Sequence, residues 1–241
     1  MKKKEKLLTR VWRIIKRTFL ILFIAQLVYI ILLKWMDPPV TITQLQNWFN
    51  GNGLKRDYVD YADMSYHVKL SVIASEDQKF PDHAGFDWKS IEKAMDYNKK
   101  KPGRTVRKSK HSLRGASTIS QQVAKNVFLW QGRSWIRKGL EVYFTKMIEW
   151  VWGKKRILEM YLNVIEMGKG VFGVEAASQA YFKKPASKLT RREAAMIAAA
   201  LPNPKVYTLK PVYPHIVTRS AQILRQMRNL EGDPDIRKII K

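Results

Sequence analysis

Residues 115–126 (GASTISQQVAKN) concentrate side chains that could bind an anionic, oxygen-rich ligand. The hydrogen-bonding groups and the cation of this stretch are Ser117, Thr118, Gln121, Gln122, Lys125 and Asn126. A packed core disfavours such a set, because each buried polar group needs a partner. Taken by itself, however, the stretch is better explained as a helix start that is capped by Ser117 or Thr118 and carries a solvated face.

A pair of carboxylates, Glu76 and Asp77, stands at the end of an apolar helical pattern and just before a turn. Partial desolvation at such a junction raises the pKa of a carboxyl group toward the range useful for a general base. A surface acid beside a turn explains the pair equally well in isolation. His83 has no companions at metal-ligand spacing, so we expect it to make a structural hydrogen bond.

A third polar group occupies residues 133–141 (RSWIRKGLE). Glu141 follows Arg137 by four residues, which predicts an ion pair within one helix. The functional alternative is that Arg133 and Glu141 share a site where a phosphate group leaves.

The charge of the chain restricts its partners. Its 241 residues include 45 Lys and Arg against 20 Asp and Glu, a formal net charge of +25. This excess favours an acidic partner, such as nucleic acid, an anionic membrane surface or a phosphorylated substrate. The absence of cysteine excludes disulfides and thiolate metal sites.

The N-terminal sequence predicts a membrane anchor. Residues 1–17 form a basic tail whose only acid is Glu5, and residues 18–33 carry no charge. We interpret residues 18–36 as an uncleaved signal anchor rather than a signal peptide, because the apolar stretch is long and lacks a small-residue cleavage site. The basic tail predicts a cytoplasmic N-terminus, which places the rest of the chain across the membrane and argues against nucleic acid as the partner.

The remainder of the chain has the pattern of a mainly α domain. Residues 37–64 form a proline-containing linker and juxtamembrane segment, residues 65–230 a helical domain, and residues 231–241 a tail. Apolar periodicity predicts helices over residues 67–77, 90–100, 154–167, 174–181 and 190–201. Thr190 and Glu193 have capping-box spacing at the start of the last helix.

Two segments have more than one interpretation. Residues 132–152 interleave aromatic and basic side chains, which suits either a membrane surface or a pair of core helices. Residues 99–110 are basic and contain proline and glycine, which predicts a mobile, solvated loop.

Together these motifs resemble the peptidoglycan glycosyltransferases, which polymerise lipid II into glycan strands. Five family motifs occur in the family's order across about residues 65–230. They are Glu76 to Phe80 with His83 and Gly85; Gly115 to Gln122 with Lys125 and Asn126; Arg137 and Lys138 with Glu141; Arg156 to Asn163 with Gly168, Gly173, Ala176, Ala177, Tyr181 and Phe182; and Leu189 to Ala195 with Leu201 to Pro204. Ser120 stands where the family more usually has threonine, which keeps the hydroxyl.

The resemblance implies a lysozyme-like glycosyltransferase domain with a small membrane-associated jaw subdomain, preceded by one transmembrane helix. The implied activity joins lipid II units by β-1,4 bonds with inversion and releases undecaprenyl diphosphate, in support of cell-wall biogenesis and cell shape. We expect a single-pass protein of the cytoplasmic (inner) membrane with its catalytic domain on the periplasmic or extracellular side. Since the sequence ends at Lys241, we expect no transpeptidase domain.

The resemblance also assigns roles to residues. Glu76 is the expected general base, and Glu141 the second catalytic glutamate on the diphosphate side. Lys125 and Arg133 match donor-phosphate contacts, assisted by Arg137 and Lys138. The residues expected to shape the substrate cleft are Asp77, Ser117, Thr118, Gln121, Gln122 and Asn126. No cofactor is expected to be required, no metal ligand is assigned, and a divalent cation (Mg²⁺ or Mn²⁺) remains an option.

The expected partners are lipid II, the glycan on undecaprenyl diphosphate, the membrane, and other cell-wall synthesis or division proteins. Two alternatives stay open at this stage. One is a lytic transglycosylase or muramidase, which would cleave glycan instead of making it. The other is a non-enzymatic, membrane-anchored basic scaffold.

Overall fold

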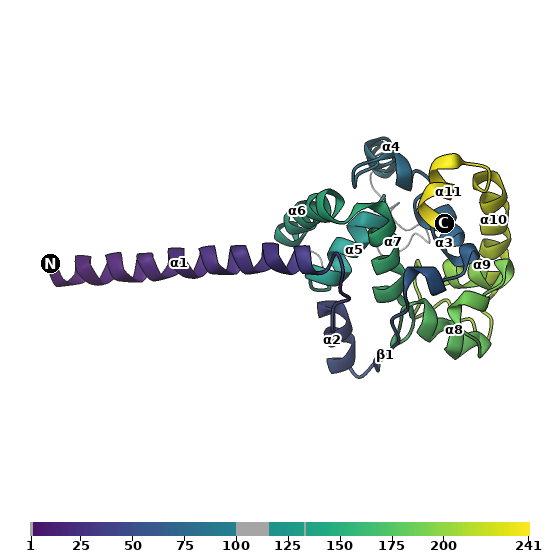
Figure 1. Cartoon of the computed structure of the whole chain (residues 1–241), viewed down its shortest axis with the longest axis horizontal. Helices are drawn as coiled ribbons and strands as arrows, with labels where there is room; N and C mark the ends of the chain where they lie inside the picture. The colour runs from purple at the N-terminus through teal and green to yellow at the C-terminus, as the bar shows by residue number, and fades with distance from the viewer. Residues whose placement is uncertain (1, 100–115, 133) are drawn as a thin grey trace. The chain divides into compact units, whose positions relative to one another are not determined.

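The computed structural model describes residues 2–99, 116–132 and 134–241, with side chains from residue 8 onward (Figure 1). The chain divides into two compact units, Met1–Pro38 and Pro39–Lys241. Each unit is described by itself below. Arg133 and most of the basic segment at residues 99–110 lie outside the described residues.

The first unit is a single helix, α1 (Lys2–Leu32). Within it, Leu8–Leu32 has a mean hydropathy of 2.0 and is long and apolar enough to cross a membrane. The helix begins inside the basic tail, because lysine and arginine are good helix formers. It ends at Leu32, a few residues before the proline pair at residues 38–39.

The second unit is mainly α, as predicted. Its helices are α2 (Ile42–Phe49), α3 (Tyr66–Glu76), α4 (Trp88–Lys99), α5 (Ile119–Phe128), α6 (Trp135–Val151), α7 (Gly153–Val164), α8 (Val174–Phe182), α9 (Arg191–Ala200), α10 (Pro214–Leu230) and α11 (Pro234–Ile240). Short 3₁₀ turns occur at η1 (Tyr61–Asp63), η2 (Phe80–Asp82) and η3 (Ala186–Lys188).

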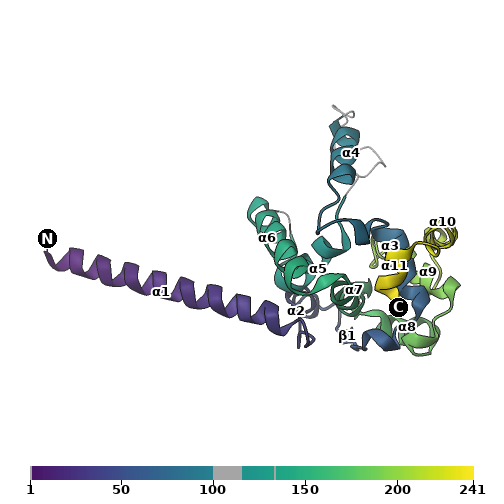
Figure 2. The same cartoon turned by 45° about the horizontal axis from the view of Figure 1, so that its top comes forward.

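The helices of the second unit form two packed groups. In one group α3 packs with α9, α10 and α11, and in the other α5 packs with α6 and α7 (Figure 2). Helix α3 is buried on every side, with Leu70, Val72 and Ile73 fully inaccessible to solvent, so the position of its last turn is well determined. Figure 2 also shows α4 standing apart from the other helices.

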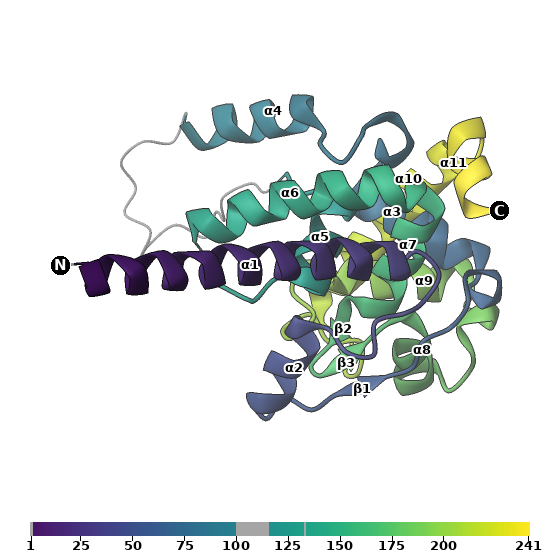
Figure 3. The same cartoon turned by 60° about the vertical axis from the view of Figure 1, so that its left-hand side comes forward.

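A small sheet has the strand order β1 (Lys55–Arg56), β3 (Val171–Phe172), β2 (Glu166–Gly168) (Figure 3). Strands β2 and β3 follow α7 in the chain, whereas β1 comes before α3. Strand β1 is parallel to β3, and β2 is antiparallel to it. The predicted helix over residues 154–167 is therefore wrong in its last three residues. The chain turns extended at Ile165, and a Cβ at Gly170 would lie 2.1 Å from the carbonyl oxygen of Asn52.

Other local predictions are confirmed. Thr190 caps α9 and forms a capping box with Glu193. Residues 132–152 contain a single helix, α6, which combines features of both earlier interpretations. It buries Thr145 and Ile148, whereas Trp135 is 92% exposed and Trp150 is 83% exposed.

Candidate active site

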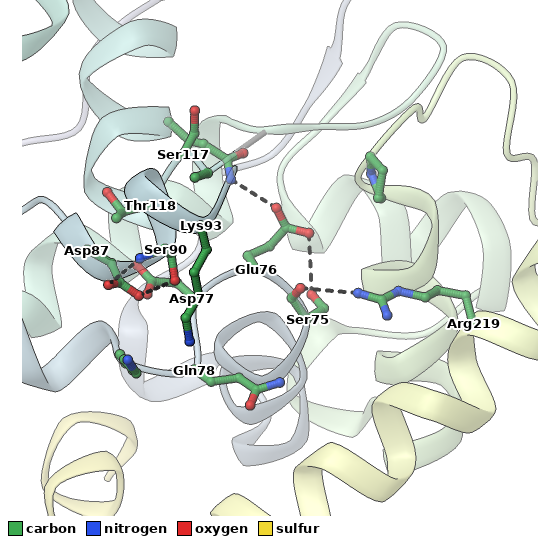
Figure 4. A pocket seen from close by; sticks show the side chains of 14 residues that line it. Ser75, Glu76, Asp77, Gln78, Asp87, Ser90, Lys93, Ser117, Thr118 and Arg219 are labelled. Atoms are coloured by element: carbon green, nitrogen blue, oxygen red, sulfur yellow. Dashed lines mark hydrogen bonds between the residues drawn. The ribbon is translucent and has the colours of Figure 1, made fainter. Parts of the chain in front are cut away.

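Glu76 is the last residue of α3 and lies in the wall of a cavity of about 810 Å³ (Figure 4). The wall is built from the end of α3, the turn that follows it, the first turns of α4, the start of α5, and α10. Its residues are Ser75, Glu76, Asp77, Gln78, Lys79, Asp87, Ser90, Lys93, Ala116, Ser117, Thr118, Gln122, Pro202 and Arg219. The cavity thus joins the first two sequence motifs, as the general-base hypothesis requires.

The carboxylate of Glu76 is held mainly by a neutral amide. Gln122 donates from Nε2 to Glu76 Oε2 at 2.9 Å, whereas the Ser75 hydroxyl is 3.5 Å from Oε1. Burial raises the pKa of Glu76 above its ordinary value, and the Gln122 hydrogen bond and the charge of Arg219 oppose this only in part. A carboxylate with a raised pKa is better suited to take a proton from an alcohol.

The adjacent carboxylate, Asp77, has a different environment. His83 Nε2 lies 3.1 Å from both of its oxygens, and the backbone N–H of Ile119 donates to Oδ2 at 3.1 Å. Because the Gly85 N–H donates to His83 Nδ1, the ring carries its hydrogen on Nε2 and donates to Asp77. Asp77 therefore joins the end of α3 to the first turn of α5, and the structural hydrogen bond expected of His83 is confirmed.

The polar stretch before and within α5 divides into structural and cavity-facing members. Thr118 caps α5 in a capping box with Gln121, and its hydroxyl also donates to the Gly85 carbonyl at 2.8 Å. Asn126 donates to the Gln122 carbonyl at 2.8 Å. The side chains of Gln121 and Asn126 are thus engaged by the fold, whereas Ser117 and Gln122 line the cavity. Substrate contact by these residues stays a prediction.

Ser120, the position that departs from the family's usual threonine, is fully buried. Its hydroxyl donates to Glu149 Oε1 at 2.5 Å, and Lys154 donates to the same oxygen at 2.6 Å. Lys154 also donates to the His83 carbonyl at 2.5 Å. The hydroxyl is therefore part of a network that fixes the turn after Glu76, which explains why serine can replace threonine here.

Glu141 lies on α6 with 3% of its surface exposed. The predicted ion pair is confirmed: Arg137 Nη1 donates to Glu141 Oε2 at 3.1 Å, and Lys138 Nζ donates to Oε1 at 2.5 Å. Lys125 on α5 connects this cluster to the cavity. Burial lowers its pKa, and its charged neighbours include both Glu141 and Glu76. The two glutamates therefore act on one cation, although 65 residues of chain separate them (141 − 76).

Sequence reasoning missed several residues of the site. Arg219 on α10 lines the cavity and donates from Nη2 to the Ser75 carbonyl at 3.3 Å. Nothing in the sequence marks it, because it is one of 45 basic residues. Lys79 and Lys93 also line the cavity. Tyr161 belongs to the fourth motif, and its hydroxyl donates to Gln122 Oε1 at 3.3 Å.

The residues present do not form a recognisable cation site. In the part of the chain that the structure describes, no group of three or more His, Asp or Glu side chains is arranged to hold a metal ion. The carboxylates nearest the site are already engaged, Asp77 by His83 and Ile119, and Glu141 by two cations.

Comparison with known proteins identifies the family of the chain. Residues 42–228 match the transglycosylase family. Biosynthetic peptidoglycan transglycosylases from Escherichia coli strain K12 / DH10B and from Shigella boydii serotype 4 are each 54% identical over 194 residues, which cover 79% of this chain and 77% of each relative. The match spans Glu76, Glu141 and every other residue placed in the site above. The chain belongs to the transglycosylase family.

Proposed function

We propose that the chain polymerises lipid II into β-1,4-linked glycan strands, with inversion at the anomeric carbon and release of undecaprenyl diphosphate. The observation that carries the proposal is the position of Glu76, a desolvated carboxylate at a cavity wall that also bears cations. The relatives named above, which are peptidoglycan transglycosylases, support the same activity.

In the proposed reaction, Glu76 accepts the proton of the acceptor sugar's 4-hydroxyl as that oxygen attacks the anomeric carbon of the donor. The new bond joins this oxygen to the anomeric carbon, while the bond from that carbon to the diphosphate oxygen breaks. The electron pair leaves with undecaprenyl diphosphate. The attack requires a base on one face of the sugar and stabilisation of the leaving group on the other.

Stabilisation of the leaving group is assigned to the cluster around Glu141. Lys125, Arg137 and Lys138 bring three positive charges together. The resemblance assigns the same role to Arg133, which lies outside the described residues. Glu141 binds two of the three cations directly and thereby fixes their positions. In a partly buried site these charges are screened less than surface lysines would be, so they can stabilise a diphosphate more effectively.

Three further cations line the cavity at Glu76: Lys79, Lys93 and Arg219. We assign them to the diphosphate of the acceptor, which is also lipid-linked. The arrangement supports a two-substrate reaction, because the cations around Glu141 and the cations that line the cavity provide one group for an anionic donor and a second for an anionic acceptor.

The substrates require a membrane context, and α1 can anchor the protein to it. We infer that the N-terminus is cytoplasmic and that the second unit lies on the periplasmic or extracellular side, since the basic excess precedes the apolar segment. The exposed Trp135 and Trp150 of α6 support a jaw subdomain that contacts the bilayer. Other cell-wall synthesis or division proteins remain proposed partners, and nucleic acid does not.

The test is to incubate the full-length protein in lipid bilayers with labelled lipid II and, separately, with preformed labelled glycan. We expect long polymer from lipid II and no fragments from glycan. Fragments from glycan without polymer would instead identify a lytic enzyme. Binding of lipid II with no turnover would identify a scaffold. In the same assay Glu76→Gln should lose polymer formation. Its matched control is Glu92→Gln, which changes an exposed glutamate on α4 and should keep the wild-type rate.

A further inference from the structure

Tyr161 reaches the site only through another residue. It is fully buried on α7, which packs against α5. Its hydroxyl donates to Gln122 Oε1 at 3.3 Å, and the other end of the same amide donates from Nε2 to Glu76 Oε2 at 2.9 Å. The three side chains form a chain of hydrogen bonds that runs from the core to the cavity wall. Figure 4 shows Glu76 at this wall.

We propose that Tyr161 is a positioning residue: its hydroxyl holds the Gln122 amide in one orientation, with the NH₂ group on Glu76 Oε2, and so leaves Glu76 Oε1 as the more weakly bonded oxygen. This inference rests on the proposed function, in which Glu76 is the base. Its basis is the asymmetry of an amide, which has a donor end and an acceptor end. Turned by half a revolution, Gln122 would present a carbonyl oxygen to a carboxylate and repel it.

Tyr161 can select the orientation because it stays a donor. Burial, together with the charges of Glu76 and Asp77, raises the pKa of Tyr161 well above its ordinary value, so the phenol keeps its proton. A buried hydroxyl whose proton points at Gln122 favours the carbonyl oxygen of the amide over its NH₂ group.

The same geometry leaves one oxygen of Glu76 for the substrate. The nearest hydroxyl to Oε1, that of Ser75, is 3.5 Å away and also lies 3.3 Å from the Val72 carbonyl. Oε1 is therefore the weakly bonded oxygen, and it is the one that a sugar hydroxyl could approach. Tyr161 contributes by keeping Oε2, and not Oε1, occupied by the amide.

Other groups act on Glu76 as well, and the test must leave them in place. Among the described residues, the charged or titratable groups that face Glu76 or share its cavity are Asp77, Lys79, Asp87, Lys93, Lys125, Tyr161 and Arg219. A Tyr161→Phe variant removes one oxygen atom and no formal charge. It therefore removes the hydrogen bond that orients the Gln122 amide and leaves every charged group around Glu76 in place.

For Tyr161→Phe we expect kcat to fall about tenfold and KM for lipid II to change less than about twofold, since one positioning hydrogen bond is lost. The Gln122 hydrogen bond favours the ionised form of Glu76, so losing it raises the pKa of Glu76. The acid limb of the pH profile should then move to higher pH by roughly half a unit to one unit. Carbon-13 NMR of labelled glutamate, assigned with Glu76→Gln, measures the same pKa without turnover.

Tyr181→Phe is the matched control, because it removes a hydroxyl that bonds the Met167 carbonyl at 3.3 Å. It should leave both the kinetics and the pKa of Glu76 unchanged. Gln122→Met should reproduce the pKa shift, and Tyr161→Phe should add nothing in that background.

An unshifted pKa in Tyr161→Phe, an equal effect of Tyr181→Phe, or additive shifts in the double variant would overturn the inference. If wild type makes no polymer, the proposed function fails instead, while the NMR titration still decides whether Tyr161 positions Gln122.

Discussion

Glu76 and Glu141 are both withdrawn from solvent, yet their surroundings differ. Glu76 receives its closest hydrogen bond from a neutral amide, and burial raises its pKa. Glu141 receives its bonds from two cations, Arg137 and Lys138, which balance its charge. The comparison teaches that one residue type can supply a proton acceptor at one position and a scaffold for cations at another, according to its neighbours.

The two glutamates should therefore respond in opposite ways to loss of charge. Replacing Glu76 by glutamine removes a poorly compensated, desolvated charge, so the fold should not be weakened at neutral pH. Replacing Glu141 by glutamine leaves the partly buried Arg137 and the more exposed Lys138 without their counter-charge. The predictions below exploit this difference.

The largest effect on stability is expected for Glu141→Gln. Breaking a buried ion pair by removing one partner costs about 3–5 kcal/mol, so the free energy of unfolding should fall by this order. Thermal and denaturant unfolding measure it, with Glu76→Gln and the exposed Glu92→Gln as controls. A Glu141→Gln variant as stable as these two would show that the cations do not depend on Glu141.

Next in size is the effect of Lys125→Met on polymerisation. This change removes the cation whose pKa both Glu76 and Glu141 influence. We expect kcat/KM to fall about 100-fold, as it does when one preorganised stabilising group is removed. The fold should keep or gain stability, because a partly buried charge is replaced by an apolar chain of similar length. The exposed Lys169→Met is the control. Equal activity in the two variants would contradict the assignment of Lys125 to the leaving group.

A smaller effect concerns the pH dependence of stability. The folded-state pKa of Glu76 is raised above the unfolded value, so ionisation of Glu76 opposes folding. Below the unfolded pKa both states are protonated and the stability associated with neutral Glu76 is fully present; it is lost as the pH rises through the folded pKa. Relative to Glu76→Gln, wild type should thus lose stability from acidic to neutral pH, by about 1.4 kcal/mol for each unit of pKa shift. A difference that is constant with pH would show that Glu76 is solvated.

Local features of the fold could be predicted from the sequence because they depend on neighbouring residues. The capping box at Thr190 and the ion pair between Arg137 and Glu141 have fixed spacing in a helix, and both are present. The end of α7 could not be predicted, because the chain leaves the helix to pair β2 with β3. Periodicity carries no information on that pairing.

The candidate site shows the same limit. Glu76 could be recognised from its motif, but its raised pKa follows from burial in the packed fold, which the distant residues Gln122 and Arg219 oppose only in part. Arg219 reaches the cavity from α10, and the Tyr161 hydroxyl reaches Gln122 from α7. Such contacts depend on how helices pack, so they become visible only in three dimensions.

The central claim is that Glu76 is the base of lipid II polymerisation. Its most direct test is the rate of polymer formation by wild type and Glu76→Gln, measured across pH with full-length protein in bilayers. We predict that wild type loses activity toward acid with an apparent pKa above that of an ordinary glutamate. Glu76→Gln should be slower by about 100-fold or more and lack this limb. A variant within about tenfold of wild type, or one that keeps the same acid limb, would contradict the account.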